Sequence, residues 1–290
     1  MKKYNFLVLI VAILFGCKPE KAKISLPKSE NKLVVSCFIS PDDSLITATV
    51  RLSVPKFNTS FVQRAGTAED IQNATVVISD GLRSVALAFD NFYYFYKAST
   101  KQFPILSGKT YYLKVSTPDG KEINAATTVP VGKLPLNSFD VKKSKDTPNE
   151  LNLEITINVN DIPNQTNYVG IGLNNPIAFK TATFNLVDTT DYGGVTLSFF
   201  DDDEKVTKTS YFTSSSSKYE GTFDTISKAF VNAVVLNCSK EFYLYNKSAF
   251  LSESSGGNPF SDPVLVYSNI NNGFGCFGSY VGNYLHARVK

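Results

Sequence analysis

Strict alternation of apolar and polar residues is the feature of this sequence that most limits its fold. Over residues 46–54 the even-numbered residues are apolar and the others polar, and residues 151–159 repeat the pattern with odd numbers. A period of two places successive side chains on opposite faces of a strand, so that one face is buried and the other meets water. Further short apolar runs follow turn signals such as Asp80-Gly81 and Asp119-Gly120. The sequence therefore predicts a mainly β protein.

The first half of the chain has the strand density of a sandwich. About seven short strands in roughly a hundred residues are typical of an immunoglobulin- or fibronectin-like β-sandwich. Residues 105–111, which end in Tyr111, resemble the turn and tyrosine that enter a late strand of fibronectin-type sandwiches, where the hydroxyl bonds back to the backbone. The alternative is a plain turn before an aromatic strand. Residues 130–135 interrupt the strand pattern, so we expect a β-sandwich domain over residues 33–133 and a second β-rich domain over 134–290.

Residues 239–254 depart from the β pattern. Phe242 and Tyr245 lie at helical spacing, and Ser239 is a suitable N-cap because its hydroxyl can accept a bond from a backbone N–H of the first turn. Gly256-Gly257 is a typical helix end, since glycine adopts the left-handed closing conformation at little cost. The sequence predicts one short helix in the second domain.

The N-terminal residues predict export and lipidation. Lys2-Lys3 precede an apolar run over residues 6–15, and Gly16-Cys17 follow. This order is typical of a secretory signal, and the run is shorter than the ~20 apolar residues that a membrane span needs. Leu14 and Gly16, before Cys17, resemble the bacterial lipobox, which implies that the signal peptide 1–16 is removed and that Cys17 is diacylated. The alternative is an ordinary secreted protein whose signal contains a cysteine.

The anchor and the charge define which partners to expect. Residues 17–32 form a polar, lysine-rich segment, interpreted as a lipidated tether in front of the first strand. Two or three acyl chains on one residue are sufficient for stable anchoring, so the membrane is an expected partner through Cys17. The net charge of +3 is spread without a basic run, and nucleic acid is therefore not an expected partner.

Cysteine usage does not indicate a disulfide framework. The sequence has four cysteines, of which three remain after the lipidation site, and an odd number cannot pair fully. Cys37 lies in a predicted buried strand, where a free thiol behaves as a small apolar group. Cys238 and Cys276 leave one disulfide open, because the sequence does not fix the distance between their Cα atoms.

Few residues have the pattern of an active or metal site. His286 is the single histidine, so a histidine-rich zinc site is excluded and a serine–histidine triad would depend on this one residue. We expect it at an exposed position on the last strand. Residues 201–204 are four consecutive carboxylates, but they lack the ligand spacing and the glycine of a calcium loop, so a solvated turn is favoured. We expect no catalytic residue, no cofactor and no metal.

Two segments after the predicted helix carry a family resemblance. Asn258-Pro259-Phe260-Ser261-Asp262-Pro263 is followed by Asn269-Ile270-Asn271-Asn272-Gly273-Phe274-Gly275-Cys276-Phe277-Gly278. With the lipobox and the chain length, this order resembles the Bacteroidetes-type lipoprotein family catalogued as domain of unknown function 4249 (DUF4249). The resemblance implies a lipoprotein of the outer membrane, displayed at the cell surface and often encoded near TonB-dependent transporters. It implies no enzyme activity and no established ligand residues.

The glycine–phenylalanine segment also has a purely structural interpretation. Gly273, Gly275 and Gly278 permit positive φ or close backbone approach, and Phe274 and Phe277 are expected to fill the core beneath them. A dinucleotide site is excluded, because the glycines do not lie between a strand and a helix.

Three functions are compatible with these patterns. The first is a lipid-anchored accessory lipoprotein that docks to a TonB-dependent transporter or another outer-membrane β-barrel and assists substrate capture or assembly. The alternative is a glycan- or peptide-binding lipoprotein that stacks its ligand on exposed aromatic residues such as Tyr93, Tyr94 and Tyr96. Only some of these are expected to be available, because alternate residues of the run must face the core. A hydrolase is the least supported, because its chemistry would depend on the single histidine.

Overall fold

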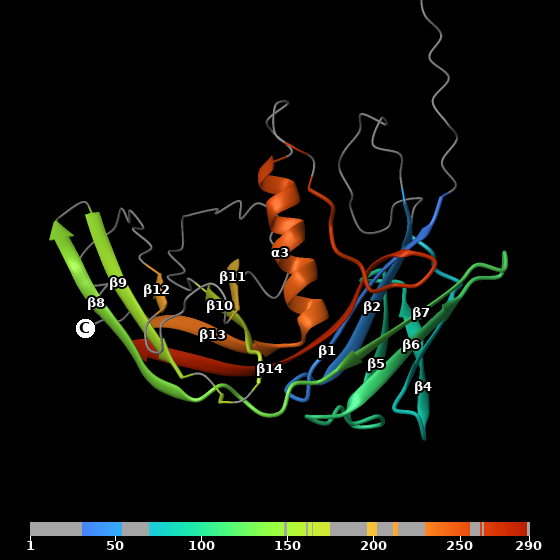
Figure 1. Cartoon of the computed structure of the whole chain (residues 1–290), viewed down its shortest axis with the longest axis horizontal. Helices are drawn as coiled ribbons and strands as arrows, with labels where there is room; N and C mark the ends of the chain where they lie inside the picture. The colour runs from blue at the N-terminus through green and yellow to red at the C-terminus, as the bar shows by residue number, and fades with distance from the viewer. Residues whose placement is uncertain are drawn as a thin grey trace, which may run out of the picture. The chain divides into compact units, whose positions relative to one another are not determined.

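The computed structural model describes residues 31–53, 70–147, 150–160, 162–163, 165–174, 196–201, 211–213, 230–255, 262 and 264–288. The signal peptide, Cys17 and most of the tether lie outside these residues. Residues 31–290 cluster as one compact unit. The described residues are mainly β, with one helix, which confirms the predicted fold class (Figure 1).

The first half is a β-sandwich of fibronectin type. β1, β2 and β5 pair in one sheet, and β3, β6 and β7 pair in the other. β4 pairs with both β3 and β5 and so joins the two sheets. The strands are β1 (Leu33–Ile39), β2 (Leu45–Leu52), β3 (Thr75–Ser79), β4 (Ser84–Asp90), β5 (Phe95–Ser99), β6 (Thr110–Ser116) and β7 (Glu122–Thr128).

The second half extends this arrangement. The described strands form one hydrogen-bonded order, β11-β10-β13-β14-β1-β2-β5-β4-β3-β6-β7, beside a separate order β12-β9-β8. The bounds are β8 (Leu136–Thr147), β9 (Glu150–Val159), β10 (Tyr168–Asn174), β11 (Thr196–Asp201), β12 (Tyr211–Thr213), β13 (Phe230–Cys238), α3 (Lys240–Ser255) and β14 (Phe274–Arg288).

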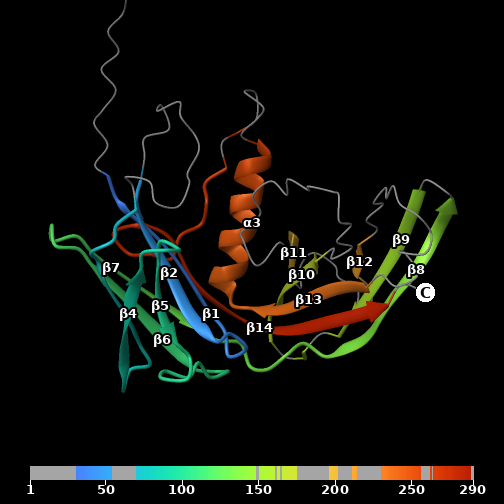
Figure 2. The same ribbon diagram turned by 180° about the vertical axis from the view of Figure 1, so that it is seen from behind.

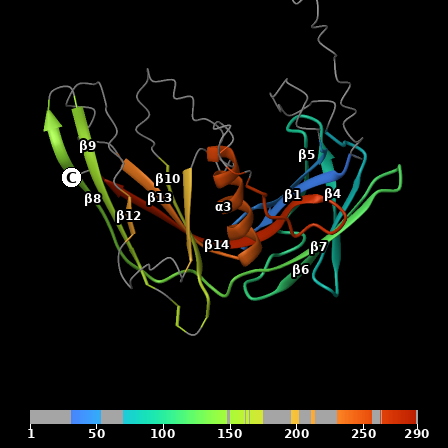
Figure 3. The ribbon, with the colours of Figure 1, turned by 45° about the horizontal axis from the view of Figure 1, so that its top comes forward.

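The helix begins as predicted. The backbone N–H of Phe242 donates to the Ser239 hydroxyl oxygen at 3.3 Å, and the N–H of Tyr243 donates to the Ser239 carbonyl at 3.0 Å. Ser239 is therefore the N-cap of α3. Phe242 is fully buried between the ring of Phe38 on β1 and that of Tyr280 on β14. Figure 3 shows α3 crossing the sheet at β14.

The last described strand lies beside the first one. β14 pairs in parallel with β1, from Val34 opposite Phe274 to Ile39 opposite Ser279, and Figure 2 shows the two strands running together. On its other edge β14 pairs with β13 in antiparallel register. The sandwich sheet therefore continues into the strands of the second half. The predicted division at residue 133 stays a prediction.

The middle of β14, residues 275–282, is covered on both faces. Phe277 and Val281 lie in the core of the sandwich with residues of β1, β2 and β6. Side chains of the opposite strand face meet the helix, where the Cys276 thiol lies 3.4 Å from the Glu241 carbonyl and Tyr280 contacts Phe242. A strand without a solvent face does not alternate between apolar and polar residues, which explains its unusual composition.

The glycines of β14 have the structural role predicted for them. Gly275 has a φ of +105°, and a Cβ there would lie 2.0 Å from the carbonyl oxygen of Val35 on β1. A Cβ on Gly278 would lie 2.9 Å from the Cβ of Phe242. Gly275 thus allows the two strands to approach, and Gly278 allows the helix to rest on the sheet.

The two phenylalanines of the segment have different environments. Phe277 is fully buried in the sandwich core, as predicted. The prediction that Phe274 also fills the core is wrong, because about half of its side chain is exposed. Phe274 is the first residue of β14 and precedes the part of the strand that is covered on both faces. Its ring lies beneath the Lys32 ammonium group, 5.2 Å from nitrogen to ring centroid.

The effect on stability of the close strand approach at Gly275 can be measured separately from the effect of its positive φ. Gly120 also has a positive φ, +85°, but a Cβ there would meet nothing within 4 Å. We expect Gly120→Ala to lower the free energy of unfolding by about 1–2 kcal/mol, the cost of a left-handed residue. Gly275→Ala should lower the free energy of unfolding by about 3 kcal/mol more than Gly120→Ala does, because β1 and β14 must move apart to accommodate the added methyl group. Urea unfolding of both variants measures the difference, and equal losses would contradict the close approach.

Candidate functional site

Strand register assigns the loops of the sandwich to two ends. Leu33, where β1 begins, pairs with Leu52, where β2 ends. β5 runs antiparallel to β2, with Ser99 opposite Leu45, so the β4–β5 loop lies at the same end as Leu33. We call this the tether end, because the predicted tether precedes Leu33. The opposite or distal end carries the β3–β4 turn, the β5–β6 loop and residues 129–133.

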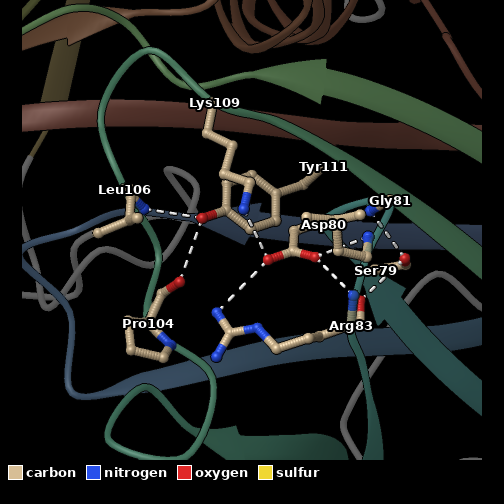
Figure 4. Close-up of polar contacts among 9 residues, drawn as sticks. Ser79, Asp80, Gly81, Arg83, Pro104, Leu106, Lys109 and Tyr111 are labelled. Atoms are coloured by element: carbon tan, nitrogen blue, oxygen red, sulfur yellow. Dashed lines mark hydrogen bonds and ion pairs between the residues drawn. The ribbon is translucent and has the colours of Figure 1, made fainter.

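A buried carboxylate holds the distal end together. The Asp80 side chain is 1% exposed and accepts hydrogen bonds from Lys109 Nζ at 2.7 Å and from the backbone N–H groups of Leu82 at 3.0 Å and Arg83 at 2.7 Å (Figure 4). The Arg83 guanidinium lies 3.4 Å from the same carboxylate. The hydrogen bond from Lys109, followed by those from the backbone, holds the pKa of Asp80 well below its usual range.

The predicted tyrosine element is confirmed beside it. The Tyr111 hydroxyl donates to the Pro104 carbonyl at 3.1 Å and accepts from the Leu106 backbone N–H at 2.8 Å (Figure 4). The side chain is fully buried. Because both partners are backbone groups of the β5–β6 loop, Tyr111 fixes this loop against the start of β6. Asp80 and Tyr111 together order the loops of the distal end.

The ordered loops of the distal end present apolar side chains to water. Leu82 is 91% exposed, and Leu106 and Val131 are each more than half exposed. The Lys109–Asp80 ion pair joins the first two loops, and the Gly108 N–H donates to the Val129 carbonyl at 2.9 Å to join the third segment. We call Leu82, Leu106 and Val131 the distal apolar set. The sequence indicated the Asp80-Gly81 turn, the tyrosine element at residues 105–111 and the break at residues 130–135, but not that their apolar side chains are exposed, although Leu82 directly after its turn was a signal for this.

The tether end presents aromatic side chains. Phe92 is 80% exposed and Tyr93 is 60% exposed. The Asp90 carboxylate accepts from the backbone N–H of Phe92 at 2.8 Å and of Tyr93 at 3.1 Å, and it pairs with Lys97. The hydrogen bond from Lys97, followed by the two backbone bonds, lowers the pKa of Asp90. Tyr94 completes the turn with a φ of +58°. The exposed rings therefore stand on a turn that is held by its own hydrogen bonds.

The aromatic platform predicted from Tyr93, Tyr94 and Tyr96 is only partly available. Tyr96 is buried, and its hydroxyl donates to the Ile71 carbonyl at 2.8 Å and accepts from the Ala74 N–H at 2.9 Å. Tyr93 instead stacks on Phe95, with 5.6 Å between ring centroids. Tyr96 is excluded as a ligand-binding residue because strand alternation turns it into the core.

The asparagines of the family-like segment have structural partners. Asn269 Nδ2 donates to the Ala126 carbonyl at 3.1 Å and to the Phe277 carbonyl at 2.8 Å, and Asn269 Oδ1 accepts from the Phe277 N–H at 3.0 Å. The Asn271 N–H donates to the Asn124 carbonyl at 2.9 Å. These bonds fasten β7 to β14. Of residues 258–263, which the resemblance also rests on, only Asp262 belongs to the described residues.

The cysteines do not form the disulfide that the sequence left open. Cys238 pairs with Tyr280 across β13 and β14, and Cys276 lies four residues before Tyr280 on β14. This separation is about 13 Å along the strand, beyond the ~7 Å that a disulfide can bridge between Cα atoms. Cys37, Cys238 and Cys276 are free and buried, and burial raises the pKa of each thiol.

The other titratable residues singled out in the sequence lie apart. His286 is exposed on β14, with its Nδ1 2.5 Å from Asn232 Oδ1 on β13, in agreement with the prediction. Asp201 accepts a hydrogen bond from the Tyr243 hydroxyl at 2.7 Å, and residues 202–204 lie outside the described part of the chain. Within that part, no three carboxylate, histidine or cysteine side chains are grouped as a metal site would require.

One open groove follows the outer face of β3, β6 and β7. Its volume is about 430 Å³. Tyr112, Lys114, Asn124 and Asn271 contribute polar groups, and Val77 contributes an apolar wall. Tyr112 is half exposed.

These features define the class of protein. It is a fibronectin-like β-sandwich whose sheet continues, through β14, into a C-terminal β region with one helix. The chain belongs to the family described as "Domain of unknown function (DUF4249)", whose model matches residues 20–282. This confirms the family identified from residues 258–278.

Other comparisons add no function. No curated protein matches the chain. A chain of the solved structure titled "Cytokine receptor complex - Crystal form 1A" is similar at 7% identity and a TM-score of 0.25, covering 88% of this chain and 95% of that one. A TM-score this low supports no argument. No helix in the described ranges has the length and hydrophobicity of a transmembrane span.

The buried ion pair at the distal end should make stability depend on pH. Because the pKa of Asp80 is depressed in the folded protein, its contribution is present above the unfolded value near ~4 and is lost as the pH falls below it. We expect Asp80→Asn to lower the free energy of unfolding at pH 7 and the difference from the wild type to shrink below about pH 4.

Asp119 supplies the matched control for this prediction. Its side chain is mostly exposed and pairs with Lys121 in the β6–β7 turn. Asp119→Asn should leave the free energy of unfolding nearly unchanged, because exposed ion pairs contribute little. Urea unfolding at pH 7 and at pH 3 decides the matter, and a constant Asp80→Asn difference at both pH values would contradict the role given to its charge.

Proposed function

We propose that this protein is a lipid-anchored accessory lipoprotein of the outer membrane, displayed at the cell surface, that acts by binding rather than by catalysis. Its partner is a TonB-dependent transporter or another outer-membrane β-barrel, and it assists substrate capture or assembly. The observation that carries the proposal is the distal apolar set. Its three exposed apolar side chains stand at one end of the sandwich on loops that are bonded to one another, and apolar side chains gathered in this way support an interaction surface more than scattered single ones do.

The geometry of the distal loops favours binding. Leu82 and Leu106 stand on loops that Asp80 and Tyr111 hold in place through buried hydrogen bonds. A partner would therefore contact side chains whose backbone is already ordered, and little conformational entropy would be lost on association. The family membership and the lipobox before Cys17 support the membrane location.

The anchor is the first part of the proposal to test. Cys17→Ser should abolish lipidation and leave unprocessed precursor, because the acyl transfer requires a thiol. Metabolic labelling with a fatty-acid analogue measures this directly. Continued incorporation of the label into the variant would contradict the lipoprotein assignment.

The docking surface has a matched control in the chain. Leu82 at the distal end and Leu265 before β14 are 91% and 90% exposed. We expect Leu82→Asp to reduce the amount of outer-membrane barrel that co-purifies with the native lipoprotein by about tenfold, the effect of losing ~1.4 kcal/mol at an interface. Leu265→Asp should leave it unchanged, and both variants should melt as the wild type does. Undiminished co-purification with Leu82→Asp would contradict the surface.

The groove over β3, β6 and β7 favours a second candidate function. An open groove of about 430 Å³ with a half-exposed tyrosine and two asparagine side chains has the composition of a site for sugar rings or short peptides. A glycan- or peptide-binding lipoprotein would retain such a polymer while purifying as a monomer without a barrel partner. If the protein retains a polymer and purifies without a barrel, the ligand-binding function is supported and the accessory function is contradicted.

A further inference from the structure

We propose that the tether end of the sandwich rests on the lipid bilayer, with Phe92 and Tyr93 in the headgroup region. The proposal rests on the lipid anchor at Cys17 from the proposed function and adds an orientation to it. It also assigns a role to exposed aromatic side chains that the docking surface at the distal end does not use.

The position of the tether is the first observation. Fifteen residues, 18–32, separate Cys17 from Leu33 at the start of β1. A coil of this length has an end-to-end distance of about 20 Å, and even a fully extended one reaches only about 50 Å. The sandwich is therefore held close to the lipid, and it is held by the end at which β1 begins.

Strand register brings three exposed aromatic residues to that end. Phe92 and Tyr93 lie on the β4–β5 loop, and Phe274 pairs with Val34 next to Leu33. Their exposure is high although the rings are large, and Phe92 and Tyr93 contact each other with 4.7 Å between centroids. Aromatic side chains are enriched at the level of the lipid headgroups, where one part of the ring contacts acyl chains and the other contacts water.

The turn that carries these rings is built to keep them outward. Asp90 binds the backbone N–H groups of Phe92 and Tyr93, and the Tyr94 N–H donates to the Asp90 carbonyl at 2.8 Å. A bulky residue at positive φ, as at Tyr94, is uncommon and persists only when its surroundings enforce it. The protein thus holds Phe92 and Tyr93 exposed through specific contacts.

The charges at the tether end are compatible with an anionic or zwitterionic lipid surface. Lys32 contributes a positive charge beside Phe274. Among the described residues, the sandwich carboxylates of this end are paired with a cation on the protein, so they offer little repulsion to lipid phosphate groups. These pairs are Asp70 with Arg51, Asp90 with Lys97, Asp119 with Lys121, and Glu122 with Lys114.

The absence of tryptophan from the sequence makes the orientation measurable. Phe92→Trp and Leu82→Trp each place one tryptophan at a highly exposed apolar position, at the tether end and at the distal end. The full-length lipidated variants are reconstituted into phosphatidylcholine–phosphatidylglycerol vesicles, with and without bromine on the acyl chains. Bromine quenches only tryptophan that lies in the bilayer.

We expect Phe92→Trp to shift its emission to the blue and to lose most of it in brominated vesicles, and Leu82→Trp to do neither. Tyr93→Trp should behave as Phe92→Trp does, which guards against a local effect of one substitution. A blue shift without bromine quenching would place Phe92 against protein and overturn the lipid assignment. Equal quenching at both ends would overturn the orientation.

Flotation of the same vesicles separates this proposal from the one it rests on. If the lipidated protein does not float with the vesicles, the anchor is wrong and both proposals fail. If it floats and Phe92→Trp is not quenched, the anchor stands and only the orientation is overturned.

Discussion

The parallel pairing of β1 with β14 is the interaction on which the rest of the structure depends. It requires Gly275, because any side chain there would collide with the carbonyl oxygen of Val35. Once β14 lies beside β1, its other edge accepts β13, and β13 accepts β10. α3 directly follows β13 and closes over the face of β14 at Gly278. A contact between the first and last described strands thus organises the intervening chain.

Buried hydroxyl groups reinforce this contact where the strand, the helix and the second sheet meet. Ser279 on β14 donates through its N–H to the Ser239 hydroxyl at 3.1 Å and through its own hydroxyl to the Thr128 carbonyl at 3.0 Å. The Thr127 hydroxyl lies 3.1 Å from the Ser279 hydroxyl. The side chains of Thr127, Ser239 and Ser279 are buried, and their hydroxyl groups would be costly to leave unpaired. The helix cap Ser239 therefore also specifies how β14 meets β7.

The same contact fixes the geometry on which the functional proposals rest. Because β14 runs parallel to β1, Phe274 lies at the tether end of the strands, which is also the end that carries the β4–β5 loop. The distal apolar set lies at the other end of the strands, roughly 20–25 Å away for strands of this length. Under the proposed anchoring, this geometry places the exposed aromatic residues on the side of the lipid and Leu82 on the side away from it.

Local patterns were sufficient to predict much of the fold from the sequence. Alternation predicted the strands, and Ser239 with the spaced aromatic residues predicted the helix. Tyr111 predicted the hydrogen-bonded β5–β6 loop of the sandwich. Contacts between residues far apart in the sequence could not be predicted in this way. The sequence pattern of a strand buried on both faces does not indicate which strand it pairs with. The β1–β14 pairing was therefore not predicted, and neither was the exposure of Phe274.

The candidate site was less predictable than the fold. Tyr93 was correctly identified as exposed. Tyr96, in contrast, is buried in the core, and its hydroxyl donates a hydrogen bond to the Ile71 carbonyl. The distal apolar set was missed, because its members come from three loops that only tertiary structure brings to one end. Register also separates Cys238 from Cys276, which composition alone could not decide.

Native-state hydrogen exchange tests the central pairing most directly. If β14 is an integral strand of the sandwich sheet, amides of β1 and of residues 274–281 should open with the same free energy as those of β6, as one cooperative unit. Exchange of β14 at a clearly lower opening free energy, while β1 and β6 remain protected, would show that β14 is only loosely attached and would contradict its central role.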